Sequence, residues 1–224
     1  METAISPSAF AAIPSQCERL AERHLAKSKE IFACGLNVSV FGGVYGTSGD
    51  TELLAETVSI GPQETFLEIG CGTGAVSLSL AKRSLGGIGV DINECAVANS
   101  RANAEALHIQ NVQFFRSDVF EQVKGTFDVI ACNPPYTDHP AHDDIDKMFW
   151  DERNEMKERF FREAGSFLNP GGRIFFAWAN FADLDANLPI RLANTHQFEI
   201  ANVTERLSPR GSCTFFVLEL KKKK

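Results

Sequence analysis

The sequence has little positive charge. Lys and Arg together number 22 against 29 Asp and Glu, which gives the 224 residues a formal net charge of −7. A long nucleic-acid footprint needs many cations to neutralise phosphates, so this balance argues against one, although a local basic patch would serve a small RNA target. The chain also lacks an apolar run near the roughly 18 residues of a membrane span, and its N-terminus lacks a basic segment followed by an apolar core. We therefore expect a cytoplasmic protein with no membrane partner.

Paired cysteines are missing as well. The six cysteines are scattered without C-x-x-C spacing, which favours free, buried thiols over a disulfide framework or a zinc site. The sequence contains no Walker loop, kinase motif or Ser/His/Asp nucleophile set. These absences argue against P-loop nucleotide hydrolases, protein kinases and hydrolases with a Ser/His/Asp nucleophile set.

Apolar segments of strand length alternate with segments of helical periodicity through most of the chain. The pattern predicts strands at 65–69, 87–92, 112–116, 126–132, 173–178, 197–203 and 213–220. It predicts helices at 15–32, 51–60, 75–83, 94–107, 147–168 and 182–194. Such alternation implies an α/β fold with a Rossmann-like, doubly wound and mostly parallel sheet of seven strands. Because no helix separates the last two strands, we expect the last strand to be inserted antiparallel.

Two parts of the chain differ in character. Residues 1–50 are expected to form an N-terminal extension with one helix and a short hairpin at 36–45. Residues 51–224 contain the regular alternation and are expected to form the main domain, with no linker or repeat inside it.

The turn after the first strand of the main domain is rich in glycine, with the sequence Gly70-Cys71-Gly72-Thr73-Gly74. Glycines at such a turn let the backbone approach a ligand closely at the N-terminus of the next helix. Asp91 ends the second strand, where an acidic side chain binds ribose hydroxyls. Asp118 follows the third strand, in a position to accept a hydrogen bond from an adenine amino group.

Two cofactors fit this geometry. Gly70, Gly72 and Ala75 match the loose G-x-G-x-x-G/A pattern of dinucleotide sites. Glu68, two residues before the first glycine, is unfavourable beside a pyrophosphate but suits a cationic ligand, such as the amino group or sulfonium of S-adenosylmethionine. Taken singly, Glu68 would also fit a solvated strand end and Asp91 a helix cap. Together, at consecutive strand ends, the acidic residues favour S-adenosylmethionine.

A second motif, Asn133-Pro134-Pro135-Tyr136, follows the apolar strand at 126–132. Pro134 moves Asn133 out of the helical region, and two successive prolines remove two backbone donors. The carbonyls of this stiff turn and the side-chain oxygen of Asn133 have few donors of their own, so they suit a planar NH2 group flanked by the ring of Tyr136. An ordinary strand-terminating turn is the alternative interpretation.

These segments resemble the class I S-adenosylmethionine-dependent methyltransferases that act on amino and amide nitrogens, including adenine-N6 enzymes and the glutamine-N5 enzymes of peptide-chain release factors. The resemblance covers roughly residues 44–178 and includes Gly49-Asp50-Thr51-Glu52-Leu53-Leu54. It departs from the family in having Ser48-Gly49 in place of Arg-Pro, about 45 residues in place of a helical N-terminal domain, and a loop of its own after Tyr136.

The resemblance implies S-adenosylmethionine as cofactor and assigns residues to each substrate. The acceptor residues are Asn133, Pro134 and Tyr136. The cofactor residues are Thr51, Glu68, Gly70, Cys71, Gly72, Gly74, Asp91, Ile92, Asp118, Val119 and Asn133.

The loop after Tyr136 carries His139, His142, Asp143, Asp144 and Asp146. His139-x-x-His142 on a loop is not a recognised ligand spacing, and methyl transfer from a sulfonium needs no metal, so we expect none. A solvated acidic loop and a lid whose carboxylates attract a cationic acceptor are the remaining interpretations. The aromatic residues at 149 and 150 fit either core packing or a wall of the acceptor pocket.

The sequence therefore predicts an N-methyltransferase that acts on a planar amide or amino nitrogen. Protein glutamine is the favoured acceptor because of the segment at 49–54, with a small-molecule amine or adenine N6 in RNA or DNA as alternatives. Two interpretations of another kind remain open, an NAD-dependent oxidoreductase and a non-catalytic adaptor that keeps the fold.

Overall fold

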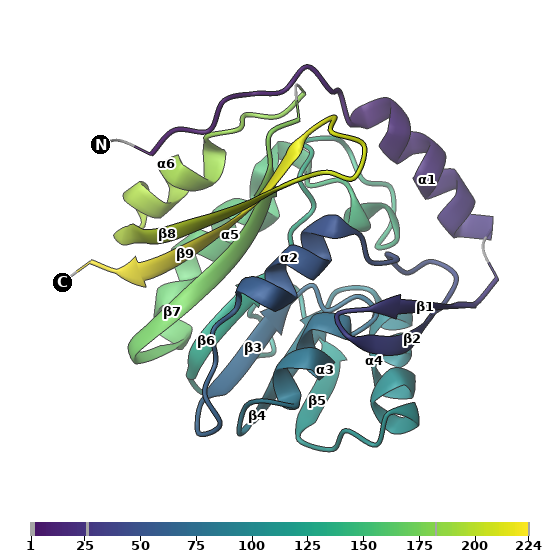
Figure 1. Ribbon diagram of the computed structural model, residues 1–224, viewed down its shortest axis with the longest axis vertical. Coiled ribbons are helices and arrows are strands. Elements are labelled where there is room, and N and C mark those ends of the chain that lie inside the picture. Colours follow the sequence, from purple (N-terminus) through teal and green to yellow (C-terminus); the bar gives the residue numbers. More distant parts are fainter. Residues whose placement is uncertain (1–2, 26, 182, 224) are drawn as a thin grey trace.

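The computed structural model describes residues 3–25, 27–181 and 183–223. Its main sheet has the strand order β5-β4-β3-β6-β7-β9-β8 (Figure 1). The strands are β3 (Thr65–Ile69), β4 (Gly86–Asp91), β5 (Val112–Arg116), β6 (Phe127–Cys132), β7 (Leu168–Ala179), β8 (Phe198–Leu207) and β9 (Thr214–Lys222). Neighbouring strands run parallel except that β9 is antiparallel to both β7 and β8. The predicted doubly wound sheet, with its last strand inserted antiparallel, is confirmed.

Helices flank this sheet. They are α2 (Gly49–Thr57), α3 (Ala75–Ala81), α4 (Glu94–Ala106), α5 (Glu155–Ala164) and α6 (Leu188–Thr195). Helix α2 packs on β7, β9 and α3, and it lies in front of the sheet in the view of Figure 1. Helix α5 packs against α6 and, through Phe160 and Phe161, on Phe176 of β7. With both faces covered, the central strands β3 and β6 are buried along most of their length.

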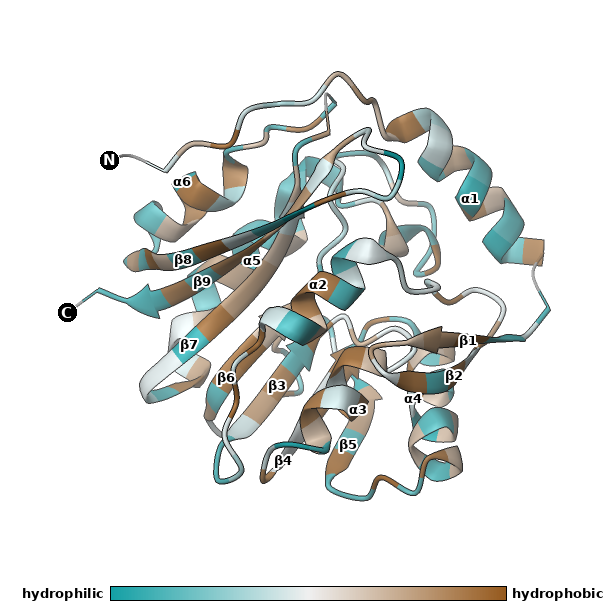
Figure 2. Ribbon diagram, viewed as in Figure 1, coloured by the Kyte–Doolittle hydropathy of each residue, from teal (hydrophilic) through white to brown (hydrophobic). Residues whose placement is uncertain are grey.

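Burial explains the apolar runs of the sequence. The β6 residues from Val129 to Cys132 are fully buried, as expected for a central parallel strand with no solvated face. Figure 2 shows hydrophobic residues concentrated on β3, β6, β7 and β9. Edge strand β8 alternates between exposed and partly buried residues along much of its length, so one face of it remains in water. No helix in the described part of the chain is long and apolar enough to cross a membrane.

The N-terminal region differs from its prediction. Helix α1 (Ile13–Leu25) ends early, and part of the segment predicted to continue it is a strand, β1 (Lys29–Ala33), paired antiparallel with β2 (Leu36–Val40). Cys34 and Gly35 connect the two strands with φ values of 51° and 75°, so the hairpin spans 29–40 and not the expected 36–45. The helix prediction for 15–32 is thus wrong beyond Leu25, apart from residue 26, which lies outside the described residues.

Helix α5 is shorter than predicted. The segment at 147–168 begins with 3₁₀ turns at Asp146–Met148 and Glu152–Asn154, and the α-helix starts only at Glu155. Asp151 causes this start, because its carboxylate accepts hydrogen bonds from the backbone N–H groups of Met156 (2.8 Å) and Lys157 (3.1 Å). Helix α6 likewise begins at Leu188 with a proline in its first turn, later than the predicted 182–194, of which residue 182 lies outside the described residues.

Candidate active site

A central cavity of about 390 Å³ opens at the carboxyl ends of β3, β4 and β6, the edge at which open α/β sheets bind ligands. Most residues that the sequence assigns to cofactor or acceptor line it. They are Thr51, Glu68, Gly70, Cys71, Gly72, Asp91, Ile92, Asp118, Val119, Asn133, Pro134 and Tyr136. The assigned residues therefore converge from five separate segments of the chain.

Gly74 does not line the cavity. It is the N-cap of α3 with φ +79°, and a Cβ there would lie 3.0 Å from Ser100 Cβ and 3.2 Å from the ring of Phe114. Its place in the glycine turn is therefore explained by backbone conformation and helix packing.

The glycine turn is anchored to β4. The backbone N–H groups of Gly70 and Cys71 donate to the carbonyl oxygen of Val90 (2.8 and 2.9 Å). The Asp91 carboxylate accepts from the Gly72 N–H at 2.9 Å and from the Asn93 N–H at 3.0 Å. Burial is the main cause that raises the pKa of Asp91. Asp91 thus connects the glycine turn to the start of α4 and still has lone pairs that face the cavity.

Glu68 is almost completely buried, with 2% of its surface exposed, so it is not a solvated strand-end charge. Its Oε2 accepts hydrogen bonds from the backbone N–H (2.9 Å) and the hydroxyl of Ser77 on α3. Burial raises the pKa of Glu68 to about 8. The side chain is consequently mostly protonated at pH 7, and an adjacent cation would favour its ionised form.

Asp118 follows β5 and its carboxylate pairs with Arg159 of α5 at 2.9 Å. Arg159 also donates to the Asp118 carbonyl oxygen (3.3 Å) and lines the cavity. Nothing in the sequence pattern singles out Arg159, because α5 approaches β5 only through the tertiary fold. The pair fixes the direction of the carboxylate that was expected to meet an adenine amino group.

Hydrogen bonds fix the side chain of Asn133. Its Nδ2 lies 3.3 Å from an Asp50 carboxylate oxygen and 3.4 Å from the Thr51 hydroxyl, and its Oδ1 accepts from the Tyr136 hydroxyl at 2.7 Å. A carboxylate can only accept, so Asp50 holds the NH2 end of the amide and the oxygen end faces Tyr136, in a residue that lines the cavity.

Asp50 is a site residue that the sequence analysis named only as part of the resembling segment at 49–54. It is buried, and it accepts hydrogen bonds from the Ser48 hydroxyl (2.5 Å) and the Thr51 N–H (2.8 Å). The single proton of the Tyr136 hydroxyl is shared between Asp50 (3.1 Å) and Asn133 Oδ1 (2.7 Å). Tyr136 thus contributes a hydroxyl to this network, while its ring packs edge-on against Trp178 at 5.4 Å. Burial raises the pKa of Tyr136 well above its ordinary value, so the hydroxyl remains a donor.

Behind the turn lies a buried ion pair. Lys157 of α5 has 1% of its side chain exposed and donates to Asp151 Oδ2 (2.8 Å), the Pro135 carbonyl (2.9 Å) and the Tyr136 carbonyl (3.4 Å). The three N–H bonds of the ammonium therefore have three acceptors. The two carbonyls that point away from the cavity are satisfied, and the turn is attached to α5.

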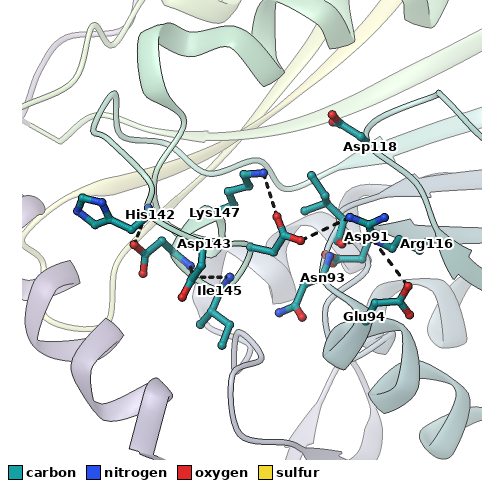
Figure 3. A network of polar contacts seen from close by, with 12 residues as sticks. Asp91, Asn93, Glu94, Arg116, Asp118, His142, Asp143, Ile145 and Lys147 are labelled. Atoms are coloured by element: carbon teal, nitrogen blue, oxygen red, sulfur yellow. Dashed lines mark hydrogen bonds and ion pairs between the residues drawn. The ribbon is translucent and has the colours of Figure 1, made fainter.

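The loop at 137–150 covers the cavity from the side of Asp91. Asp144 pairs with Lys147 (2.9 Å) and with Arg116 at the end of β5 (3.6 Å). Figure 3 shows Lys147 and Arg116 in this network, with Asp91 nearby. The residues of this loop that line the cavity include Asp144, Lys147, Phe149 and Trp150. Phe149 and Trp150 therefore form part of the cavity wall as well as packing against the core.

A cluster of possible metal ligands lies farther along the same loop. One ligand atom each of His24, Asp143 and Asp146 lies within 4.8 Å of the others. Asp143 accepts from the N–H groups of Ile145 and Asp146, and Asp146 accepts from the N–H of His142 and contacts His24 at 3.2 Å. These carboxylates are therefore engaged in shaping the loop.

Comparison with known proteins identifies relatives. A family model described as "Methyltransferase small domain" matches residues 39–203. The chain is 36% identical over 147 residues to a putative protein N5-glutamine methyltransferase of Methanocaldococcus jannaschii, a match that covers 62% of this chain and 74% of that protein. It is 32% identical over 145 residues to ribosomal RNA small subunit methyltransferase C of Escherichia coli, covering 62% of this chain and 39% of the relative.

A solved structure shares the fold. The Thermus thermophilus 16S rRNA N2 G1207 methyltransferase, in complex with AdoMet and guanosine, superposes with a TM-score of 0.63 at 21% identity. The match covers 88% of this chain and 50% of that one.

The raised pKa of Glu68 predicts a pH-dependent stability. A carboxyl group that titrates near 8 in the folded protein and near 4.5 when unfolded stabilises the fold fully below 4.5, and this contribution is lost as pH rises towards 8. Glu68→Gln removes the titration. We expect the free energy of unfolding of wild type, relative to the variant, to fall by up to about 1.4 kcal/mol per pH unit between pH 5.5 and 7.5.

Denaturant unfolding at several pH values measures this difference. Glu64→Gln is the control, because the pairing of Glu64 with Arg173 lowers the pKa of Glu64 and its ionisation is complete over this range. A wild-type minus Glu68→Gln difference that does not change with pH would contradict the prediction.

The buried pair predicts a specific pattern in a double mutant. Lys157→Met leaves Asp151 buried without its counter-ion, which costs about 3–5 kcal/mol of stability. Adding Asp151→Asn removes the uncompensated charge but keeps an oxygen that caps α5, so the double variant should recover a large part of this loss. Lys147→Met, which breaks an exposed pair, should cost at most about 1 kcal/mol. A double variant no more stable than Lys157→Met alone contradicts the assignment.

Proposed function

Because the chain belongs to the methyltransferase small domain family and is an S-adenosylmethionine-dependent N-methyltransferase, we propose that it methylates the side-chain amide nitrogen of a glutamine in a protein. Family membership decides between the two cofactors that the glycine turn fits, and it argues against an NAD-dependent oxidoreductase or a non-catalytic adaptor. The observation that carries the acceptor assignment is the fixed orientation of the Asn133 amide beside a free Pro134 carbonyl.

An amide nitrogen is a poor nucleophile because its lone pair is delocalised into the carbonyl group. Two oxygen acceptors aimed at its two N–H bonds hold the nitrogen in place and favour pyramidal geometry as it attacks. Asp50 and Tyr136 direct Asn133 Oδ1 toward the cavity, and the Pro134 carbonyl accepts no hydrogen bond from any described residue. These two oxygens are the proposed acceptors for the NH2 group.

The residues of the cavity fit S-adenosylmethionine on the donor side. When bound, this cofactor supplies a methyl group on a positively charged sulfur. The glycine turn allows close approach of the backbone, and Asp91 retains lone pairs for ribose hydroxyls. Glu68, which is buried and has no basic partner among the described residues, would be ionised by a cationic ligand. Asp118, held by Arg159, is the proposed acceptor for the adenine amino group, with Thr51, Cys71, Ile92 and Val119 as further contacts.

Transfer then requires alignment and electrostatic stabilisation more than a strong base. Positive charge develops on the acceptor nitrogen during attack, and the oxygens of Asn133 and Pro134 are already oriented toward it. Holding the nitrogen in line with the methyl group lowers the entropic part of the barrier. The nitrogen loses its proton more readily once methylated.

A guanine or adenine amino group in RNA is the second candidate. One relative is named as a ribosomal RNA methyltransferase, and aromatic side chains line the cavity, namely Tyr45, Phe149, Trp150, Phe181 and Phe215. The net charge of −7 and the acidic residues Asp144, Glu152 and Glu155 in the cavity wall count against a polyanionic substrate.

Acceptor identity is tested by incubating the protein with radiolabelled S-adenosylmethionine and either the protein fraction or the RNA fraction of a cell extract. We expect label in protein, at a glutamine that mass spectrometry identifies by one added methyl group. Label in RNA alone, with transfer that weakens steeply as salt increases, would replace glutamine with a nucleobase as the acceptor.

Two variants separate the proposed roles within the cavity. Asn133→Ala should keep donor affinity within a few-fold and lower single-turnover transfer by ~10²–10³, the usual effect of removing one preorganised group. Asp91→Ala should instead weaken donor binding by at least about tenfold, because it removes charge-assisted hydrogen bonds. Calorimetry and single-turnover methylation in the same preparations measure both. Transfer near the wild-type rate in Asn133→Ala would reduce Asn133 to a turn residue.

A further inference from the structure

Helix α1 lies across the carboxyl ends of the central strands, beside the cavity (Figure 1). Three contacts hold it there. The N–H groups of Ala12 and Ile13 donate to Asp183 (2.9 and 2.7 Å), the Arg23 carbonyl accepts from the Gly43 N–H (3.0 Å), and His24 contacts Asp146 (3.2 Å). The helix is thus attached to the segment between β7 and α6, to the segment before α2 and to the loop at 137–150.

The buried face of α1 is unusual in that its one buried residue is polar. That residue is Gln16, with 6% of its surface exposed, and it lines the cavity. Burying an amide is unfavourable unless its groups are hydrogen-bonded, so a helix that only needed to pack would place an apolar side chain here.

Only one end of the Gln16 amide has a partner. Its Oε1 accepts from the hydroxyl of Thr137, the residue after the Asn133–Tyr136 turn, at 2.8 Å. Its Nε2 donates to no described residue, yet it is not among the fully enclosed atoms that lack a partner. Since Gln16 lines the cavity and Thr137 directly follows Tyr136, this NH2 group is available close to the Asn133–Tyr136 turn.

Arg19 follows one helical turn later and also lines the cavity. Its guanidinium lies 5.4 Å from the ring centre of Tyr45 and 5.0 Å from that of Phe149. Lys147 and Arg159, two other cations of the cavity wall, pair with Asp144 and Asp118, whereas Arg19 has no ion pair with any described carboxylate. Stacking on the two rings and a contact with the Tyr45 hydroxyl hold the guanidinium in place, and its other N–H groups are available.

We propose that α1 is the acceptor-recognition helix of this enzyme, with Gln16 donating to the carbonyl oxygen of the acceptor amide and Arg19 to an oxygen of the peptide chain that carries it. The proposal rests on the proposed glutamine acceptor. The acceptor NH2 then meets the oxygens of Asn133 and Pro134 while its carbonyl meets a donor, so both ends of the amide are paired. An amine has no carbonyl oxygen and would leave the Gln16 donor buried and unpaired, which selects for an amide.

The first test compares Gln16→Leu, which keeps the size of the side chain, with Glu18→Leu on the exposed side of α1. Titration of S-adenosylhomocysteine measures binding at the donor site. Titration of a peptide with one central glutamine into the S-adenosylhomocysteine complex measures binding at the acceptor site. Losing one hydrogen bond should raise the acceptor Kd and KM about tenfold in Gln16→Leu, with donor affinity near that of wild type. Tm should fall, because the buried Thr137 hydroxyl loses its acceptor. Glu18→Leu should match wild type in every measurement.

The second test concerns Arg19. Arg19→Met keeps an unbranched apolar stem beside Tyr45 and Phe149 but removes the donors. It should weaken binding of a peptide with one central glutamine about tenfold. It should leave binding of propionamide, which carries the amide without the peptide chain, unchanged. Equal effects on both ligands would overturn the assignment of Arg19.

Failure of the inference differs from failure of the proposed function. If wild type methylates glutamine and Gln16→Leu binds and methylates it equally well, the role of α1 is refuted and glutamine stands. If wild type methylates only a nucleobase, the glutamine proposal is wrong. The recognition role of α1 is then upheld if Gln16→Leu weakens binding of that RNA with donor affinity unchanged, and overturned if it does not. A parallel loss of donor affinity in Gln16→Leu also overturns it.

Discussion

The constraint on which the site depends is that the Asn133–Tyr136 turn cannot satisfy its own carbonyls. Two successive prolines contribute no N–H, so the donors must come from side chains. Lys157 supplies donors to the Pro135 and Tyr136 carbonyls behind the turn, and Tyr136 supplies its hydroxyl to Asn133. The Pro134 carbonyl receives none from the described residues and remains free for an acceptor. Because some of these groups are hydrogen-bonded and others are not, a turn that ends a strand holds two oxygens, Asn133 Oδ1 and the Pro134 carbonyl, in fixed orientations.

Sheet topology brings the donor residues to this turn. β3 lies between β4 and β6, so the glycine turn after β3 has Asp91 on one side and Asn133 on the other. Since parallel strands end at the same edge, acidic and amide side chains far apart in sequence meet around one cavity. Helix α2 then adds Asp50 and Thr51 from above, and the Asp50 carboxylate decides which end of the Asn133 amide faces inward.

Segments outside the alternating strands and helices complete the enclosure. Asp144 attaches the loop at 137–150 to Arg116 beyond β5, and Asp146 attaches the same loop to His24 of α1. The acidic residues of this loop, which by sequence suggested either a metal site or a charged lid, mostly hold the loop and α1 in position. Helix α1 is thereby fixed beside the cavity, which its buried polar residue, Gln16, helps to line.

The sequence by itself determined the sheet and the positions of the motifs, because both depend on local patterns. Continuous apolar runs marked the buried strands, and the glycines, Asp91 and the Asn133–Tyr136 motif follow directly from strand ends. It did not determine the break between α1 and β1, since Ile31 and Phe32 suit a helix as well as a hairpin until Leu36–Val40 pairs with them. Only the tertiary structure brought Asp50, Lys157 and Arg159 to the site and paired Gln16 with Thr137, 121 residues away, because such contacts depend on packing between elements and leave no periodic trace in the chain.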